Sequence, residues 1–209
     1  MKSLHDMARI QMVAEQLAAR DIIDKRVLTA MGEVPRELFV PQEMEMIAYF
    51  DRPLPIGSDQ TISQPYIVAL MAQALCLTGT EMLLEVGGGC GYSAAVYGHL
   101  VARVDSYEII PELAEQARIN LEKIACDNVN IIAGDATALQ GNELFDVISV
   151  AAAPENVPPA LIKLLKKGGH MVIPIGPQNL SQWLMLISKH EDGSLREQSL
   201  CPVGFVPLT

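Results

Sequence analysis

The strongest chemical signal in the sequence is a group of glycines that follows an apolar run. Residues 83–92 read Leu-Leu-Glu-Val-Gly-Gly-Gly-Cys-Gly-Tyr, with four glycines in five positions ahead of a predicted helix. Because glycine has no side chain, a ligand can approach such a turn closely, and the helix that follows offers free N–H groups. We interpret the turn as part of a nucleotide-type cofactor site, with an ordinary tight strand–helix turn as the alternative. The residues of this turn are Gly87, Gly88, Gly89, Cys90 and Gly91.

Three carboxylates accompany the glycine turn. Glu85 comes immediately before it, where a positively charged cofactor tail would be attracted and the pyrophosphate of a dinucleotide repelled. Glu108 closes the next predicted strand, where its carboxylate can accept from both ribose hydroxyls. Asp135 ends the third strand and could bind an adenine amino group. These charges best match S-adenosylmethionine, whose sulfonium and amino groups are positive.

A nicotinamide cofactor is the alternative, because Gly89, Gly91 and Ala94 also form a G-x-G-x-x-A pattern. Glu108 fits either cofactor. The chain offers no clear pair of residues for hydride transfer, and its four histidines are scattered, so we assign none of them to catalysis.

The elements that would position these residues alternate along the chain from Tyr66 onward. This order predicts an α/β fold with a doubly wound, mostly parallel, Rossmann-like sheet and C-terminal antiparallel strands. We place the end of the last helix at Gly168-Gly169. The predicted helices are Tyr66–Leu77, Ser93–Leu100, Pro111–Ala125 and Pro158–Leu165, and the predicted strands are Glu81–Val86, Val101–Tyr107, Val129–Ala133, Phe145–Val150, His170–Ile175, Trp183–Lys189 and Gln198–Pro207.

The first sixty residues have a different character. Apolar residues at helical spacing predict a helix over Met7–Ala19, and a second short helix fits Arg26–Met31. Prolines then interrupt the pattern, and Leu54–Gly57 is typical of an extended segment or turn. We expect residues 1–60 to form a helical flank and lid packed on a main domain of residues 61–209, the whole being one structural unit.

Composition excludes several classes of protein. The 209 residues are 50% hydrophobic, which rules out wholesale disorder, and the net charge of −10 argues against binding to nucleic acid or an anionic membrane. No apolar run is long enough to span a bilayer, and the N-terminus does not resemble a secretory signal. The four cysteines are far apart, so we expect reduced thiols, no metal site and a cytoplasmic location.

The segment after the fourth strand bears on the acceptor of a methyl group. Ser149–Pro154 reads Ser-Val-Ala-Ala-Ala-Pro, which leaves room for a substrate but supplies no amide or acid to hold an amine. Methylation of a nucleic-acid base or of a glutamine is therefore disfavoured.

Several motifs resemble those of the protein-L-isoaspartate O-methyltransferase family. The most specific are Asp-Arg-Pro-Leu-Pro-Ile-Gly at 51–57 and Thr-Ile-Ser-Gln-Pro at 61–65. Val-Pro-Arg-Glu-Leu-Phe-Val-Pro at 34–41 and Phe-Val-Pro-Leu at 205–208 are also similar, so the resemblance covers nearly the whole chain. The chain departs from the family pattern at Ala136, Ala151 and Gly204.

The resemblance implies that the chain methylates the free α-carboxylate of L-isoaspartyl residues in damaged proteins, with D-aspartyl residues as further candidates, releasing S-adenosyl-L-homocysteine. The methyl ester would then collapse to a succinimide without the enzyme, which starts repair. A monomer or weak dimer is expected. The implied cofactor contacts are Gln60, Thr61, Ile62, Ser63, the glycine turn, Glu108, Asp135 and Ala136, and the implied substrate contacts are Ser63, Ala152, Ala153, Pro154 and Thr209.

Ser63 is the residue that the resemblance marks as catalytic. It also precedes Gln64-Pro65 and a predicted helix, so a role as helix N-cap is the alternative. Methyl transfer to an already ionised carboxylate needs alignment and removal of water rather than a general base. Two other functions stay open: a methyltransferase of the same fold with a small-molecule acceptor, and a cofactor-binding relative with little activity.

Overall fold

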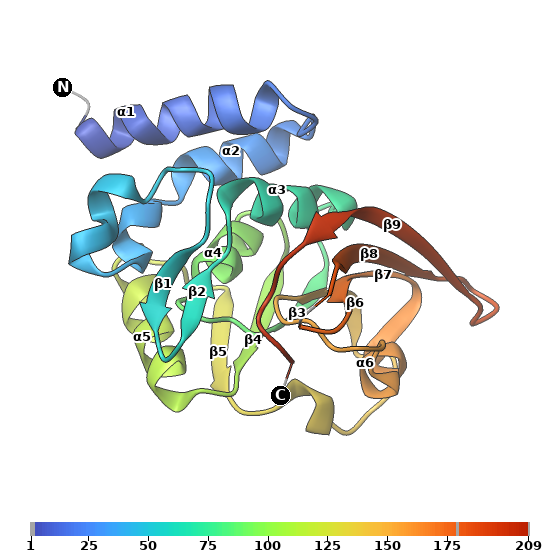
Figure 1. Cartoon of the computed structure of the whole chain (residues 1–209). Coiled ribbons are helices and arrows are strands. Elements are labelled where there is room, and N and C mark those ends of the chain that lie inside the picture. The colour runs from blue at the N-terminus through green and yellow to red at the C-terminus, as the bar shows by residue number, and fades with distance from the viewer. Residues whose placement is uncertain (1–2, 179, 209) are drawn as a thin grey trace.

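The computed structural model describes residues 3–178 and 180–208. They form a seven-stranded sheet with helices packed around it (Figure 1). The strand order is β5-β4-β3-β6-β7-β8-β9; the first five strands are mutually parallel, and β8 and β9 add antiparallel pairs. The predicted doubly wound sheet with C-terminal antiparallel strands is confirmed. The strands are β3 (Met82–Val86), β4 (Arg103–Glu108), β5 (Val129–Ala133), β6 (Phe145–Val150), β7 (Leu165–Ile175), β8 (Gln182–Lys189) and β9 (Leu195–Val203).

The helices fall close to their predicted ranges. The first predicted helix is an α-helix followed by a π-helical continuation, and the C-terminal ends of α3 and α5 lie three residues earlier than predicted. Among the described residues, no helix is both long and apolar enough to cross a lipid bilayer. The helices are α1 (Leu4–Gln11), η1 (Met12–Ala18), α2 (Lys25–Glu33), η2 (Arg36–Phe39), η3 (Gln42–Ile47), α3 (Pro65–Ala74), α4 (Tyr92–Gly98), α5 (Pro111–Glu122), η4 (Ala136–Ala138) and α6 (Pro159–Leu164).

The sheet separates two hydrophobic cores, because successive residues of a strand point to opposite faces. Leu83 packs in the core that contains α3, α4 and α5, whereas its neighbour Leu84 packs in the core that contains α6. Val147 and Ile148 of β6 divide in the same way. Helices therefore cover both faces, which leaves the ends of the strands as the accessible part of the central sheet.

The segment 165–175 differs from its prediction. The expected helix end at Gly168-Gly169 is wrong, because α6 ends at Leu164 and both glycines lie inside β7. The register of β6 and β7 shifts between Phe145 and Val147, and a Cβ on Gly169 would lie 2.5 Å from the Asp146 carbonyl oxygen. These glycines thus allow close approach at a strand irregularity rather than ending a helix.

The first sixty residues pack onto the α3 side of the sheet. Figure 1 shows α1 and α2 stacked over α3, and buried residues of η1 (Met12 and Leu17) and of α2 (Met31) belong to the same core as α3 and α4. A short hairpin of β1 (Leu54–Gly57) and β2 (Gln60–Ile62) completes this region.

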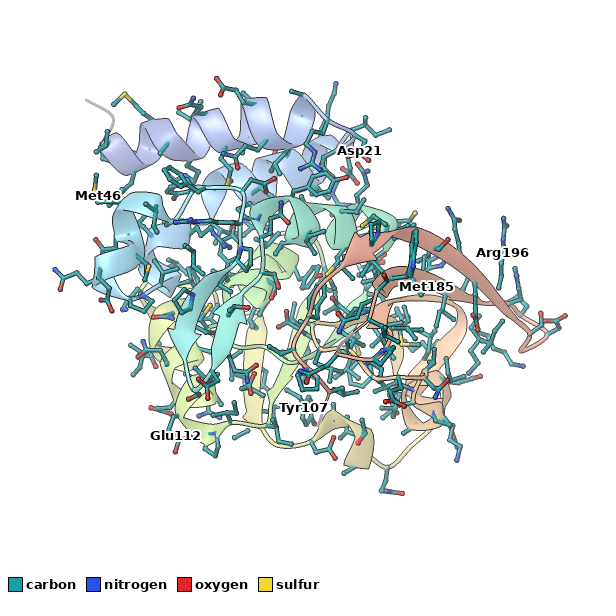
Figure 2. The ribbon with its side chains drawn as sticks, in the orientation of Figure 1. Asp21, Met46, Tyr107, Glu112, Met185 and Arg196 are labelled. Atoms are coloured by element: carbon teal, nitrogen blue, oxygen red, sulfur yellow. The ribbon has the colours of Figure 1, made fainter. Side chains whose placement is uncertain are left out.

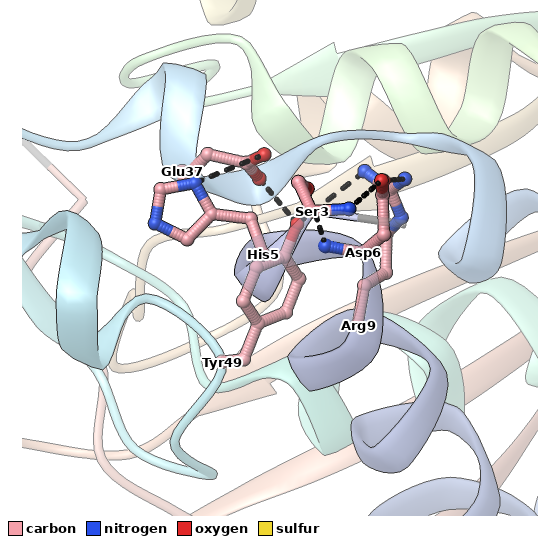
Figure 3. Close-up of polar contacts among 6 residues, drawn as sticks. All are labelled: Ser3, His5, Asp6, Arg9, Glu37 and Tyr49. Carbon is pink, nitrogen blue, oxygen red and sulfur yellow. Dashed lines mark hydrogen bonds and ion pairs between the residues drawn. The ribbon is translucent and has the colours of Figure 1, made fainter. Parts of the chain in front are cut away.

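Polar contacts attach the start of α1 to the η2 and η3 region (Figure 3). The Tyr49 hydroxyl donates to the Glu37 carboxylate, and His5 Nδ1 lies 3.7 Å from the same carboxylate. Arg9 pairs with Asp6 at 2.7 Å, and Asp6 and Ser3 cap the helix reciprocally. The His5 contact and a 3.5 Å hydrogen bond from Arg9 Nη1 to the Tyr49 hydroxyl thus link α1 to this region.

The double-core arrangement predicts the cost of truncating a central strand residue. Leu84 is fully buried, so Leu84→Ala is expected to lower the free energy of unfolding by about 2–5 kcal/mol through lost contacts and the cavity left behind. Urea denaturation measures the change. Leu180→Ala is the matched control, because Leu180 is 73% exposed and the same truncation there should cost less than about 0.5 kcal/mol. Equal losses in the two variants would contradict the placement of Leu84.

Candidate functional site

The carboxyl ends of β3, β4 and β6 border a cleft of about 1000 Å³, including its open mouth. β4 and β6 lie on either side of β3, so the chain reverses its direction across the sheet at this point, which is where open α/β sheets bind ligands. Tyr107, labelled in Figure 2, marks this edge of the sheet and lines the cleft. The lining includes Gln60, Thr61, Ile62, Ser63, Gly87, Gly88, Gly89, Cys90, Glu108, Asp135, Ala136 and Ala152 from the predicted site.

The glycine turn after β3 packs directly against the end of β4. The N–H groups of Gly87 and Gly88 both donate to the Tyr107 carbonyl, at 2.8 and 3.1 Å. A Cβ on Gly88 would lie 2.3 Å from Ser106 Oγ, so a larger residue there would require the Ser106 side chain to move from its place beside Glu85. Gly91 has φ of +88° and begins α4 as its N-cap; it does not line the cleft. The turn is therefore shaped by close backbone contact.

Glu108 is the carboxylate most firmly placed at the cleft. Its Oε2 accepts from the Gly89 N–H at 2.7 Å, and its Oε1 accepts from the Ile110 N–H at 2.9 Å. The side chain is buried but still lines the cleft, so each oxygen keeps lone pairs for further donors. This geometry suits a pair of adjacent hydroxyl groups.

Asp135 lies at the cleft after β5 and is exposed. Its Oδ1 accepts from the Thr137 N–H at 2.8 Å, and the Thr137 hydroxyl also donates to the carboxylate. Asp135 therefore caps the short turn of η4 and presents a fixed carboxylate at the same edge as Glu108.

Glu85 lies beneath the glycine turn rather than on the cleft surface. It is fully buried, its Oε2 accepts from the Ser106 hydroxyl at 2.5 Å, and its Oε1 has no hydrogen-bond partner in the described part of the chain. Burial raises the pKa of Glu85 to about 7, against the lowering effect of its hydrogen bonds with Ser106 and Ser93. Glu85 is thus the one expected cofactor contact, besides Gly91, that does not line the cleft.

Ser63 lies between two cavities. It lines the main cleft and also a neighbouring cavity of about 520 Å³, and Thr61, Ala151 and Val206 do the same. Within residues 3–178 and 180–208, its hydroxyl makes no hydrogen bond to another protein group. A side chain so placed is free to bind a ligand from either cavity.

The role of Ser63 as a helix N-cap is not found. The helix α3 starts at Pro65 with Gln64 as the N-cap, and the N–H of Tyr66 in its first turn donates to Asp51 Oδ1 at 3.1 Å. A carboxylate from a distant segment does the capping that the local sequence suggested for serine. Asp51 also forms an ion pair with Arg20 at 3.0 Å rather than with its neighbour Arg52.

The C-terminal tail forms one wall of the cleft. Ala153 and the tail exchange hydrogen bonds: the Ala153 N–H donates to the Val206 carbonyl at 2.8 Å, and the Leu208 N–H donates to the Ala153 carbonyl at 3.1 Å. Of the expected substrate contacts after β6, Ala152 lines the cleft, whereas Ala153 and Pro154 do not. Thr209 lies outside the described residues.

Sequence reasoning missed part of the cleft wall. Ile109 and Ile110 follow Glu108 directly, and Ile109 is 49% exposed. An apolar pair placed immediately after a strand-end carboxylate was the available signal. The other unpredicted lining residues are Val68, Val86, Tyr92, Ser93, Tyr107, Gly134, Ala151, Val206, Pro207 and Leu208.

Comparison with known proteins bears directly on this site. The family model described as protein-L-isoaspartate(D-aspartate) O-methyltransferase (PCMT) matches residues 8–209. This chain belongs to that family. The motifs that first suggested it, at 51–57 and 61–65, supply Ser63 and the hairpin beside the cleft.

Individual members of the family are similar over almost their full length. A protein-L-isoaspartate O-methyltransferase 2 from Anaeromyxobacter sp. is 47% identical over 99% of this chain and 85% of its own, and one from Marinobacter nauticus is 48% identical over 99% and 94%. A Plasmodium falciparum chain described as PCMT, crystallised in complex with S-adenosyl-L-homocysteine, matches with a TM-score of 0.81 at 26% identity, covering 100% of this chain and 99% of that one.

The buried Glu85 predicts a pH dependence of stability. The folded protein holds its proton up to about pH 7, whereas the unfolded chain releases it near 4.5, so the folded state binds the proton more tightly. The contribution is fully present below the lower value and is lost as the pH rises through the higher one. Between about pH 5 and pH 8 we expect the unmodified protein to lose roughly 2–3 kcal/mol more than Glu85→Gln, measured by urea denaturation.

Glu197→Gln is the control for this comparison, because it makes the same change at an exposed position on β9. Its pH profile should follow that of the unmodified protein. Parallel profiles for the unmodified protein and Glu85→Gln would contradict a raised pKa of Glu85.

Proposed function

We propose that this chain transfers the methyl group of S-adenosyl-L-methionine to the free α-carboxylate of L-isoaspartyl residues, with D-aspartyl residues as further candidates, in proteins and peptides. The observation that carries the proposal is the place of Ser63, whose side chain borders both the main cleft and the neighbouring cavity. One cavity suits the methyl donor and the other suits the acceptor peptide. The family relatives named above are protein-L-isoaspartate O-methyltransferases.

The main cleft suits the donor cofactor. Glu108 offers carboxylate oxygens to the ribose hydroxyls, and the exposed Asp135 offers an acceptor to the adenine amino group. Ile109 and Ile110 add apolar surface for the flat face of the base. The bound cofactor supplies an electrophilic methyl carbon on a positively charged sulfur. Glu85 lies beneath the turn and, in its ionised form, would attract that positive end through its charge rather than by contact.

The reaction does not require the protein to transfer a proton. An α-carboxylate with a pKa near 3.5 is ionised at neutral pH, so its oxygen can attack the methyl carbon directly while the sulfur–carbon bond breaks. The products are a methyl ester and a neutral thioether, and no proton has to move. The ester then closes to a succinimide without the enzyme. The chain therefore needs to orient the carboxylate and exclude water from it.

The charges around the cavities fit this requirement. The described residues that line the two cavities include no lysine, arginine or histidine. The reaction joins a negative oxygen to a methyl group that leaves a positive sulfur, so charge disappears in the transition state. A cation beside the carboxylate would stabilise the ground state more than the transition state and slow the step. The Ser63 hydroxyl, which is an uncharged donor, orients the carboxylate instead.

The smaller cavity suits an uncharged stretch of peptide. Its lining combines apolar residues such as Pro53, Ile67 and Phe205 with the polar Thr61 and Gln64. In this proposal residues 1–60 act as a flank and lid over the main domain of residues 61–209, since Gln60 lines the main cleft and Pro53 lines the smaller cavity. We further propose that the protein acts in the cytoplasm as a monomer or weak dimer, on isoaspartyl proteins, without binding nucleic acid or membrane.

A pair of matched peptides tests the function. We expect the protein to transfer labelled methyl groups from S-adenosyl-L-methionine to an isoaspartyl peptide and not to the same peptide with normal aspartate. Activity on small metabolites but on neither peptide would instead select a methyltransferase with a small-molecule acceptor. Binding of S-adenosyl-L-homocysteine with no turnover on any acceptor would indicate a cofactor-binding relative.

The role of Ser63 is tested by Ser63→Ala. Loss of the orienting hydrogen bond should lower kcat on the isoaspartyl peptide roughly tenfold or more, with the melting temperature unchanged, because the hydroxyl has no protein partner to lose. Ser199→Ala, at an exposed position on β9, should leave kcat unchanged. A Ser63→Ala protein with full turnover would remove Ser63 from the mechanism.

A further inference from the structure

Arg36 is a fully buried arginine that binds main-chain carbonyl groups instead of a carboxylate. Its Nε donates to the Ala48 carbonyl at 2.7 Å, and its Nη2 donates to the Ser63 carbonyl at 2.8 Å. The guanidinium carbon lies 4.7 Å from the centre of the Tyr92 ring, and Tyr92 is the residue that follows the glycine turn. One side chain thus contacts Ser63 and a second lining residue of the main cleft.

Burying an arginine in this way is unfavourable for folding, so stability alone does not account for it. Burial lowers the pKa of Arg36, yet an arginine stays charged in proteins, so its desolvation is compensated only by two carbonyl groups and an aromatic face. Its Nη1 has no hydrogen-bond partner in the described residues. An apolar side chain of similar size would fill the space without this penalty. What an apolar side chain cannot supply is a rigid fork of donors that fixes two carbonyl groups relative to each other.

Asp51 holds the other side of the same segment. Its Oδ2 accepts from the Gln64 side-chain amide at 2.8 Å, and its Oδ1 accepts from the Tyr66 N–H at 3.1 Å. The residues immediately after Ser63 are therefore fixed by a carboxylate, and the carbonyl of Ser63 itself by a guanidinium. Both holding residues come from the N-terminal flank, whereas the Ser63 side chain remains without a protein partner.

We propose that Arg36 is a positioning residue for methyl transfer. It holds the Ser63 carbonyl so that the Ser63 hydroxyl stays at the boundary of the two cavities, and Asp51 holds the residues that follow Ser63. The proposal rests on the proposed function of Ser63. It assigns the N-terminal flank a role in the geometry of the reaction in addition to covering the cleft.

Arg26 provides a control of the same residue type within the same chain, at a position that is exposed where Arg36 is buried. It also projects from a helix of the flank and donates to two carbonyl groups, those of Leu77 at 2.6 Å and Leu100 at 2.8 Å. Neither carbonyl belongs to a residue that lines the two cavities. Arg26→Lys and Arg36→Lys therefore remove the same fork geometry, in one case away from the site and in the other behind Ser63.

The experiment compares Arg36→Lys, Asp51→Asn and Arg26→Lys on an isoaspartyl peptide, with the unmodified protein in the same assay. We expect Arg36→Lys and Asp51→Asn to lower kcat about tenfold or more while the Kd for S-adenosyl-L-homocysteine, measured by calorimetry, stays within about twofold. Arg26→Lys should lower the melting temperature but leave kcat and Kd unchanged. If the unmodified protein does not methylate the peptide, that result counts against the proposed function and not against the positioning role of Arg36 and Asp51.

Two results would overturn the positioning role. One is a folded Arg36→Lys protein whose kcat matches that of Arg26→Lys. The other is a parallel loss of kcat and of S-adenosyl-L-homocysteine affinity, which would mean that Arg36 merely supports the whole fold. If Arg36→Lys does not fold, Asp51→Asn is the deciding variant, because the Asp51 side chain is 23% exposed and its replacement disturbs no buried charge. Unchanged kcat in that variant would reject the positioning role.

Discussion

The contact between the glycine turn and the end of β4 is the constraint on which the site depends. The N–H groups of Gly87 and Gly88 bind the Tyr107 carbonyl, and the N–H of Gly89 binds the carboxylate of Glu108. A side chain on Gly88 would collide with the Ser106 hydroxyl, which donates to Glu85 at the end of β3, and would have to displace it. Because the turn lies flat against β4, Glu108 is held with its carboxylate at the cleft. The same contact covers Glu85, whose burial follows from the close packing above it.

The cleft is completed by segments that are distant in sequence. The hairpin of β1 and β2 approaches the turn closely enough that a Cβ on Gly89 would lie 3.2 Å from Ile56 Cδ1. The C-terminal tail reaches the opposite wall through its hydrogen bonds to Ala153. Both segments come from outside the alternating helices and strands, so the parallel sheet supplies the floor of the cleft, and the hairpin and the C-terminal tail supply walls. Ser63 lies where these parts meet.

Patterns that depend on neighbouring residues were readable from the sequence. The strands β5 and β6 match their predicted ranges, because short apolar runs bounded by turn residues define them locally. The glycine turn, Glu108 and Asp135 were also placed correctly at one edge, since parallel strands end together. Features that depend on distant partners were not readable. The glycines at 168–169 mark a strand irregularity set by β6, and Asp51 rather than Ser63 caps α3.

The placement of charge links the fold to the chemistry. Arg36 brings a permanent positive charge close to Ser63, yet its Nε and Nη2 donate to carbonyl groups and its guanidinium faces an aromatic ring, so the charge is directed into the protein. An arginine facing the cavity would bind a peptide carboxylate tightly and make it a weaker nucleophile. In the proposed function, an arginine directed away from the cavities still fixes the main chain, and the substrate meets the neutral hydroxyl of Ser63. In the proposed reaction, which removes charge, the cation Arg36 organises the backbone and does not touch the reacting groups.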